Sequence, residues 1–96
     1  MVKGTTSTGF KFSFDKARLD DMRLIEAFSD SVDESVDNLQ RLKASKQILE
    51  RLLGHEQKEK LYNHIEGYSN GLIPSGALAK ELNDILAAVP GNTVKN

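Results

Sequence analysis

Two histidines are the first residues in this chain that could bind a metal ion or move a proton. His55 and His64 are nine residues apart, and on an α-helix that spacing separates them by about 180°. They therefore cannot bind one metal ion from one helical face. The string His55-Glu56-Gln57-Lys58-Glu59 begins like a zinc protease helix, but Glu59 occupies the position of the second histidine. We expect both histidines to lie on the surface without a metal.

Two acidic stretches and one serine–lysine spacing complete the possible chemistry. Asp20-Asp21 and Asp30-Ser31-Val32-Asp33-Glu34 could attract a cation. Neither has the glycine and the terminal glutamate of a calcium-binding loop, and helix capping accounts for both. Ser13-Phe14-Asp15-Lys16 matches S-x-x-K by letter, without the companion motifs of that catalytic class. The sequence therefore predicts a protein that is not an enzyme, with no catalytic, cofactor-binding or metal-binding residues.

The composition limits the class of protein. A length of 96 residues fits one domain, and a net charge of −1 argues against a general nucleic-acid binder, which is usually basic. The chain has no cysteine, so neither a disulfide nor a thiolate metal site is expected. Its first residues, MVKGTTSTG, are polar, and no apolar run approaches the roughly 20 residues of a membrane span. We expect a cytoplasmic protein that binds neither nucleic acid nor membranes.

Charge is divided between two consecutive segments. From Asp15 to Asp37 there are eight acids and three bases, a net charge of −5, whereas from Asn38 to His64 there are six bases and three acids, a net charge of +3. The two segments could form solvated faces that attract each other within one molecule. They could also make the molecule polar enough to stack head to tail with copies of itself. The sequence leaves both interpretations open.

The segment from Gly9 to Phe14, GFKFSF, predicts a β-strand. Phe10, Phe12 and Phe14 alternate with polar residues, which is the period of a half-buried strand. Because a lone strand leaves its backbone unpaired, it needs a partner. Lys3 to Thr8 could supply that partner through a hairpin, and another chain could supply it along the strand edge. We expect the three phenylalanines to pack in the core.

The stretch from Ile48 to Ile65, ILERLLGHEQKEKLYNHI, predicts the end of one amphipathic helix and the start of another. Leu49, Leu52 and Leu53 have the i, i+3, i+4 spacing of one helical face. Gly54 follows as a helix stop, because glycine adopts a left-handed backbone at little cost. Upstream, the same face is extended by Val36, Leu39, Leu42 and Ser45. The stripe of the next helix consists of Leu61, Tyr62 and Ile65.

The first expected helix covers Leu19 to Ser31. Its N-cap is predicted to be Asp20 or Asp21, or Asp15 if the helix starts earlier, since each carboxylate could accept the free amide hydrogens of a first turn. Its buried stripe is predicted to be Met22, Ile25 and either Phe28 or Ala27.

The second and third helices follow from the central stretch. The second is expected from Glu34 to Leu53 with Asp33 as its cap, and the third from Glu56 to Glu66, with Gly67 ending it. Because the connection through Gly54 is so short, these two helices should pack as neighbours.

A turn and a fourth helix complete the pattern. Asn70-Gly71, in the loop from Gly67 to Leu72, is a strong turn dipeptide. Pro74 suits the first position of a helix, with Ser75 as the cap if the helix begins later. Pro90-Gly91 should end this helix. Its apolar period consists of Leu78, Leu82, Ile85, Leu86 and Val89.

These elements predict a mainly α fold, a small bundle of four helices with a short N-terminal β-strand or hairpin. Residues 1–8 are expected to be a flexible N-terminus or a weak first strand, residues 9–90 a single helical domain, and residues 91–96 a disordered C-terminal tail. The pattern does not show which residues would bind a partner.

Three blocks of the sequence carry a family resemblance. The first is GFKFSFD followed by LDDMRLIEAFSD, the second is ILERLLGHEQKEKLYNHI, and the third is IPSGALAKELNDIL. In this order they resemble the small tail assembly chaperones of long-tailed, siphovirus-type phages and prophages of Gram-positive bacteria. The resemblance covers about Gly9 to Ala88, and it rests on packing and capping features rather than on catalytic signatures.

The resemblance implies a function in virion morphogenesis. Members of this family coat the long, aggregation-prone tape measure protein in the host cytoplasm while tail tube subunits polymerise around it, and they are absent from the mature virion. It therefore implies the tape measure protein as a partner, the tail tube protein as a second candidate partner, and self-association. The family supplies no catalytic residues. The alternative is a DNA-binding regulator that uses the last two helices as a helix-turn-helix, against which stands a last helix with Lys80 as its only base.

Overall fold

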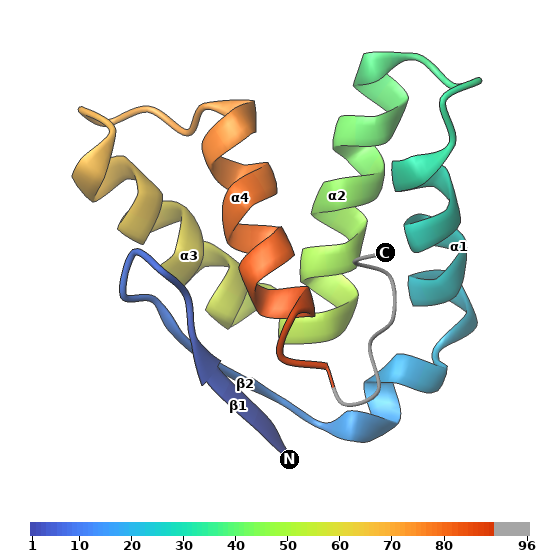
Figure 1. Ribbon diagram of the computed structural model, residues 1–96, viewed down its shortest axis with the longest axis horizontal. Coiled ribbons are helices and arrows are strands. Elements are labelled where there is room, and N and C mark those ends of the chain that lie inside the picture. Colours follow the sequence, from blue (N-terminus) through green and yellow to red (C-terminus); the bar gives the residue numbers. More distant parts are fainter. Residues whose placement is uncertain (90–96) are drawn as a thin grey trace.

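The computed structural model describes residues 1–89. Within this part of the chain, two strands and a short 3-10 helix precede four α-helices, as Figure 1 shows. The fold is mainly helical with an N-terminal antiparallel hairpin, which confirms the predicted fold class. The elements are β1 (Val2–Thr5), β2 (Lys11–Phe14), η1 (Lys16–Asp20), α1 (Met22–Val32), α2 (Asn38–Leu53), α3 (His55–Tyr68) and α4 (Ser75–Leu86). Pro90-Gly91 and the expected tail at residues 91–96 lie outside the described residues, but α4 already ends at Leu86, before the predicted stop.

The hairpin confirms the period-two pattern of the N-terminal sequence. β1 pairs antiparallel with β2, with Val2 opposite Phe14 and Gly4 opposite Phe12. The side chains of Phe10, Phe12 and Phe14 are all buried, as an alternating strand with one core-facing side requires. The partner of the predicted strand therefore comes from the same chain, through the segment that was expected to be either flexible or a weak strand.

One edge of the hairpin is closed by a side chain of α3. The Ser13 amide of β2 donates to Gln57 Oε1 at 3.0 Å, and Gln57 Nε2 donates back to the Ser13 carbonyl at 2.6 Å. Gln57 Nε2 also donates to the Leu53 carbonyl at 3.0 Å. The side-chain amide of Gln57 thus pairs with the free backbone groups of Ser13, as a third strand would. These bonds attach the hairpin to the junction of α2 and α3.

The first helix is split into two pieces. Asp15 caps η1 by accepting from the Ala17 amide, and Asp21 caps α1 by accepting from the Arg23 amide. Two of the three candidate caps, Asp15 and Asp21, are therefore used, each for a different helix, and Asp20 is not an N-cap. The chain turns between the pieces at Asp21, whose extended backbone ends one helix and starts the next.

The predicted buried stripe of α1 is wrong in two of its members. Met22 is 62% exposed and Ile25 is 43% exposed, whereas Leu24 and Ala27 are buried and Phe28 is partly buried. The apolar residues of α1 extend around more than one face, so the i, i+3 spacing from Met22 fits the sequence as well as the spacing from Leu24. α1 packs mainly against α2, and the side of α1 that is buried is the one that carries Leu24 and Ala27.

The second helix begins four residues later than predicted. α2 starts at Asn38, because Asp37 accepts the Gln40 amide as the N-cap. Asp33, the expected cap, instead accepts from the amide and hydroxyl of Ser35 in the preceding turn, which lowers the pKa of Asp33. Both aspartates are local hydrogen-bond acceptors, and only the structure shows which of them starts the helix.

The upstream extension of the α2 stripe is also wrong. The C-terminal half of α2 is buried as predicted through Ile48, Leu49, Leu52 and Leu53, but Leu39 and Leu42 are exposed and Val36 is only partly buried. In Figure 1 the N-terminal half of α2 extends away from the hairpin, and the helix beside it there is α1. The N-terminal half of α2 therefore keeps the apolar spacing of a buried face, but the described part of the chain does not cover it.

Gly54 is the single residue between α2 and α3. Its φ of 86° is in the left-handed region that favours glycine, and it is the C-cap of α2 and the N-cap of α3. The predicted stop at Gly54 is confirmed. The predicted stop at Gly67 is wrong, because α3 continues to Tyr68 and ends at the turn of Asn70 and Gly71, both of which have positive φ.

The fourth helix starts one residue later than Pro74, which is its N-cap rather than its first residue. Leu78, Leu82 and Ile85 are buried, and Leu86 and Val89 pack partly against the core, as the periodicity predicts. The core joins all four helices to the hairpin. Its fully buried apolar side chains are Leu24, Ile48, Leu49, Leu52, Leu61, Ile65 and Ile85.

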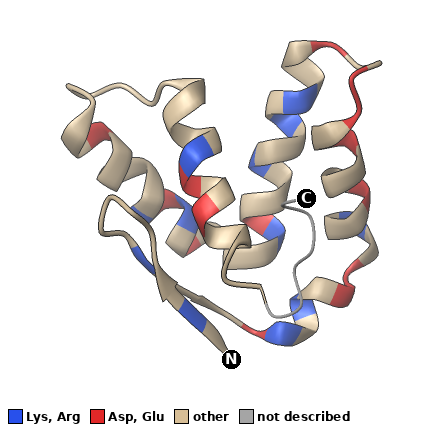
Figure 2. Cartoon of the chain, in the orientation of Figure 1, with Lys and Arg blue, Asp and Glu red and all other residues tan. Residues whose placement is uncertain are grey.

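The two oppositely charged segments of the sequence lie side by side. Figure 2 shows acidic residues along α1 and the turn after it, and basic residues along the neighbouring helix α2. Arg51 Nε of α2 lies 3.6 Å from Asp21 Oδ2 at the start of α1. No helix among residues 1–89 is long and apolar enough to cross a membrane.

Candidate functional site

The two histidines have separate surroundings. His55 Nδ1 at the start of α3 lies 3.5 Å from Glu50 Oε2, and its side chain is exposed. His64 lies about two and a half turns further along α3. It is half-buried, and its Nε2 is 3.0 Å from the Thr8 hydroxyl. Within residues 1–89, no group of three or more His, Cys, Asp or Glu side chains is placed to hold a metal ion. The structure brings neither histidine to the acidic stretches at Asp20-Asp21 or Asp30–Glu34.

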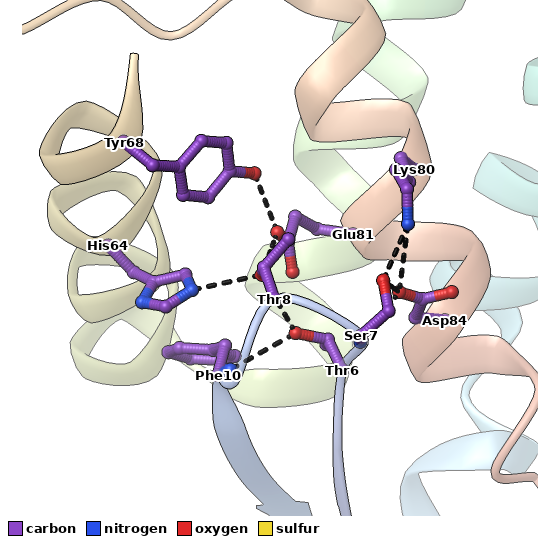
Figure 3. Close-up of polar contacts among 9 residues, drawn as sticks. All are labelled: Thr6, Ser7, Thr8, Phe10, His64, Tyr68, Lys80, Glu81 and Asp84. Carbon is purple, nitrogen blue, oxygen red and sulfur yellow. Dashed lines mark hydrogen bonds and ion pairs between the residues drawn. The ribbon is translucent and has the colours of Figure 1, made fainter. Parts of the chain in front are cut away.

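The densest group of polar side chains lies where the hairpin turn meets α3 and α4 (Figure 3). We call it the hairpin-tip cluster. Thr6, Ser7 and Thr8 come from the turn between β1 and β2, and the remaining side chains come from the facing sides of the two helices. Its members are Thr6, Ser7, Thr8, His64, Tyr68, Lys80, Glu81 and Asp84.

Glu81 is the centre of the hairpin-tip cluster. It has no exposed surface, and its Oε2 accepts from the Thr8 hydroxyl at 2.5 Å and from the Tyr68 hydroxyl at 2.6 Å. Its Oε1 is buried without a hydrogen bond of ordinary geometry among residues 1–89. Burial alone would raise the pKa of Glu81, but the donors Thr8 and Tyr68, with Thr6 at a less favourable geometry and the nearby His64, lower it overall. Glu81 is therefore a buried carboxylate held in its ionised form.

The hydrogen bonds around Thr8 fix which nitrogen of His64 carries a proton. The Thr8 hydroxyl donates its only hydrogen to Glu81, so it must accept from His64 Nε2. The same hydroxyl oxygen lies 3.2 Å from the Thr6 hydroxyl, and Thr6 in turn accepts the Phe10 amide at 3.1 Å. The turn thus presents a chain of hydroxyl groups that ends on a carboxylate and leaves Thr8 with no free proton.

Tyr68 closes the cluster from the end of α3. Burial and the hydrogen bond to the Glu81 carboxylate raise the pKa of Tyr68 to about 12, since both disfavour a phenolate beside a carboxylate. The Tyr68 ring also meets the His64 ring edge-on, with centroids 5.5 Å apart. The phenol is therefore a donor at neutral pH and cannot serve as a base.

A second set of contacts holds the tip of the turn to α4. Asp84 Oδ2 accepts from the Ser7 amide at 3.0 Å and from the Ser7 hydroxyl at 2.8 Å, and these bonds lower the pKa of Asp84. Lys80 Nζ donates to the Ser7 hydroxyl at 2.5 Å and lies 3.7 Å from Asp84 Oδ2. The turn is therefore attached at Ser7 and at Thr8 to successive turns of one helix.

The arrangement of the hairpin-tip cluster is that of a structural clamp. Apart from Glu81 Oε1, its hydroxyl, imidazole and carboxylate groups are paired with one another. Two shallow surface depressions lie over the outer face of the hairpin and between α1 and α2, and neither is lined by a member of the cluster. A nucleophile would need a neighbouring base that is free to take its proton, whereas Glu81 is buried beneath Thr8 and Tyr68. The cluster holds the hairpin on the helices.

Sequence reasoning missed the cluster, although one signal for it was present. Glu81 lies between Leu78 and Leu82 on the apolar stripe of α4, where a carboxylate must find donors if it is to be buried. One hydroxyl donor, Tyr68, lies 13 residues before Glu81 on another helix, and the other, Thr8, is 73 residues away in the sequence. The sequence thus indicates that Glu81 needs partners but does not show which residues they are.

A buried lysine forms another polar contact at the junction of α2 and α3. Lys58 Nζ lies 2.8 Å from Glu50 Oε2 and 3.3 Å from Glu59 Oε2, and 5.0 Å from the centroid of the Tyr62 ring. The hydrogen bond to Glu50 raises the pKa of Lys58, and the same bond lowers the pKa of Glu50. This lysine supports the tight corner at Gly54 and is not available to a ligand.

The remaining candidate is a set of exposed apolar side chains on α1 and the start of α2. Five large apolar side chains there are exposed, and the spacing of four of them in the sequence is that of buried residues. We call this set of side chains the α1–α2 face. Its apolar members are Met22, Ile25, Val32, Leu39 and Leu42.

Comparisons with protein-family models, with curated proteins and with solved structures gave no match for this chain. Its function is therefore argued from its own residues. These residues offer one polar cluster whose groups are paired with one another except for Glu81 Oε1, and a set of exposed apolar side chains on α1 and the start of α2.

Proposed function

We propose that this chain is a non-enzymatic phage tail assembly chaperone that binds the tape measure protein and keeps it soluble in the host cytoplasm during tail tube assembly. The proposal combines the resemblance of three sequence blocks with one structural observation, the α1–α2 face. A chaperone of this kind must present apolar surface to an aggregation-prone partner, and exposed apolar groups on a small soluble fold mark such interaction sites.

The partner chemistry follows from the surface. The α1–α2 face presents apolar side chains at intervals of three and seven residues on α1 and of three residues on the neighbouring helix α2. Such a surface suits the apolar side of an amphipathic helix, which packs its own i and i+3 or i+4 residues against it. A long, helical tape measure protein offers many segments of this type.

The hairpin-tip cluster gives this proposal a rigid scaffold. Because Ser7, Thr8 and Gln57 attach the hairpin to α3 and α4, the core does not rely on α1 alone. α1 packs mainly against α2, at the edge of the molecule in Figure 1. An apolar surface on that edge helix can bind a partner without exposing the core.

DNA binding is less well supported by the described residues. Lys80, the one base of α4, is bonded to Ser7 and paired with Asp84, so it is not free to contact a phosphate. The other charges of α4 are the carboxylates of Glu81 and Asp84. A recognition helix would present free basic or amide side chains to the groove.

Co-expression tests the proposal. The chain is produced together with the tape measure protein encoded in its gene neighbourhood, and the soluble fraction of the tape measure protein is measured. The chaperone proposal predicts that this fraction rises with the wild-type chain and falls again with Val32→Asp, which places a charge on the α1–α2 face. Leu72→Asp is the matched control, because Leu72 is 65% exposed and Val32 69% exposed. A tape measure protein that stays insoluble beside the wild-type chain would contradict the proposal.

A further inference from the structure

One of the two shallow surface depressions lies between α1 and α2, and we call it the basic depression. The side chains that line it come from the first turn of α1 and the second half of α2, and all of them are polar or charged. They are Arg23, Lys46, Gln47, Glu50 and Arg51. Three bases and one acid therefore share one surface of the molecule.

The acid in this lining is already paired. Glu50 Oε2 lies 2.8 Å from Lys58 Nζ and 3.5 Å from His55 Nδ1, both of which belong to α3. Because Lys58 is buried, this ion pair is part of the corner between α2 and α3. Glu50 is therefore not free to neutralise the bases of the depression.

The three bases are less well balanced. Arg23 and Lys46 are exposed, and neither side chain forms an ion pair or a hydrogen bond within residues 1–89. Arg51 has Asp21 as its ion-pair partner, with Nε 3.6 Å from Oδ2, but this Nε is buried and donates no hydrogen bond in the described chain. The lining thus holds more positive charge than its ion pairs neutralise.

Such a lining fits oxyanions. The guanidinium groups of Arg23 and Arg51 can each donate paired hydrogen bonds to a carboxylate or a phosphate group, and Lys46 adds a point charge. The depression is shallow, whereas a site for a small molecule is concave and encloses most of its ligand. The oxyanion therefore belongs to a larger molecule and projects from its surface.

The charge of the neighbouring helix limits what that larger molecule can be. Residues 22–37, which are α1 and the turn after it, contain five acids and one base, a net charge of −4. They lie beside the basic helix α2 in Figure 2, so they would repel a long row of phosphates, as in nucleic acid or on an anionic membrane. A few carboxylates confined to one short stretch of a protein surface avoid this repulsion.

We propose that the basic depression binds two neighbouring carboxylates on one helix of a partner protein. Glutamates at positions i and i+4 lie about 5–6 Å apart on the same side of a helix, so both can enter one depression. Arg23 would contact them from α1, and Lys46 and Arg51 would contact them from α2.

This inference goes beyond the proposed function, because it assigns a charge pattern to the partner and rests on the polar lining alone. The exposed apolar side chains of α1 and α2 take no part in the argument. If the partner is the tape measure protein, the segments that bind here carry paired acids. A chain that binds an acidic helix in the depression and still leaves the tape measure protein insoluble would retain this site and lose the proposed function.

Nuclear magnetic resonance on the isotope-labelled chain tests the site. The probe is an alanine-based helical peptide with glutamates at i and i+4, and the same peptide with glutamines is its control. In a buffer of low ionic strength, where exposed ion pairs are least screened, we expect the glutamate peptide to shift the backbone amide signals of the five lining residues. The glutamine peptide should leave these signals unchanged.

Two variants with the same change in net charge separate the depression from general electrostatic attraction. Arg23→Gln with Lys46→Gln removes two bases of the lining, and Lys43→Gln with Lys60→Gln removes two exposed bases outside it. The first should bind the glutamate peptide on the order of fivefold more weakly, as expected for the loss of two exposed ion pairs, and the second should bind it like the wild type. All four positions are exposed, and circular dichroism checks that both variants keep the fold.

Three results would overturn the proposal. Lining signals of the wild-type chain that do not respond to the glutamate peptide would show that the depression binds no paired carboxylates. Equal weakening in the two variants would show attraction by net charge alone. Inorganic phosphate that shifts the same signals at a lower concentration than the peptide would assign the depression to a phosphate-bearing ligand instead.

Discussion

Removing the hydroxyl of Tyr68 tests whether the hairpin-tip cluster holds the fold together. Tyr68→Phe deletes the donor that lies 2.6 Å from Glu81 Oε2 and leaves a buried carboxylate with one partner fewer. Hydrogen bonds to charged groups contribute about 1.5–3 kcal/mol. Because Tyr68 is 45% exposed, water competes for its hydroxyl, and we expect a loss of about 1–2 kcal/mol in the free energy of unfolding.

The same helix provides the control. Tyr62 also lies on α3, and its ring keeps its contact with Lys58 Nζ, 5.0 Å from the centroid, when its hydroxyl is removed. Tyr62→Phe should change the free energy of unfolding by less than about 0.5 kcal/mol. Thermal and urea unfolding followed by circular dichroism measure both variants, and for a domain of this size each kcal/mol corresponds to roughly 4–8 °C in Tm.

The pH dependence distinguishes a hydrogen bond to a carboxylate from simple packing. The pKa of Tyr68 in the folded state is raised to about 12 from an ordinary value of 10.0. Its contribution is therefore fully present below pH 10 and is lost as the pH rises from 10 to about 12. Glu81 behaves in the opposite way, because its pKa is lowered below 4.5. Its contribution is present above pH 4.5 and is lost as the pH falls through its folded pKa.

Two results would refute this reasoning. One is a Tyr68→Phe variant as stable as the wild type at pH 7, or a Tyr62→Phe variant that loses as much. The other is an alkaline limb between pH 10 and 12 that is equally steep with and without the Tyr68 hydroxyl, which would show that the phenol titrates freely in the folded state.

Three further predictions concern the hairpin, the glycines and the cap of α2. Phe12→Lys places a charge in the core at a side chain that is 5% exposed, so circular dichroism should show an unfolded chain at 25 °C; a folded variant would contradict the core position of β2. Gly67→Ala, inside α3 where an added Cβ meets open space, should raise the free energy of unfolding by about 0.5–1 kcal/mol. Gly54→Ala, at a φ of 86°, should lower it by about 1 kcal/mol or more. Equal effects of the two substitutions in urea unfolding would be inconsistent with these backbone conformations. Asp37→Ala should cost about 1 kcal/mol, because Asp37 accepts the Gln40 amide, and Asp33→Ala should cost less; the reverse order would move the start of α2 back toward residue 34.

The helices and the hairpin were predictable from the sequence, because their periodicity is local. Phe10, Phe12 and Phe14 alternate with polar residues and are buried in the hairpin, and the stop at Gly54 lies where a glycine follows the last buried leucine. Helix starts were less accurate, since Asp33 and Asp37 are both chemically able to cap a helix and only one of them does.

The buried face of α1 could not be predicted from periodicity alone. Met22 and Ile25 form one apolar spacing and Leu24 and Ala27 form another, and only the position of α2 decides between them. Met22, Ile25, Leu39 and Leu42, which were predicted to be buried, now belong with Val32 to the α1–α2 face. Some residues of α1 and α2 have the spacing of buried side chains but are exposed in the described chain. This difference is the signal on which the proposed function depends.

The hairpin-tip cluster was out of reach for a different reason. A carboxylate on the apolar stripe of α4 shows that Glu81 requires donors. The positions of Thr8 and Tyr68 depend on how the hairpin is placed against two helices, and that placement is set by contacts between residues far apart in the sequence.

The central claim is that this chain is a chaperone for the tape measure protein. The most direct measurement is co-expression with that protein, followed by affinity purification on the tape measure protein and size exclusion with light scattering. The account predicts a soluble complex with several copies of this chain on each tape measure molecule, weakened by Val32→Asp and unchanged by Leu72→Asp. An insoluble tape measure protein beside uncomplexed copies of this chain would contradict it.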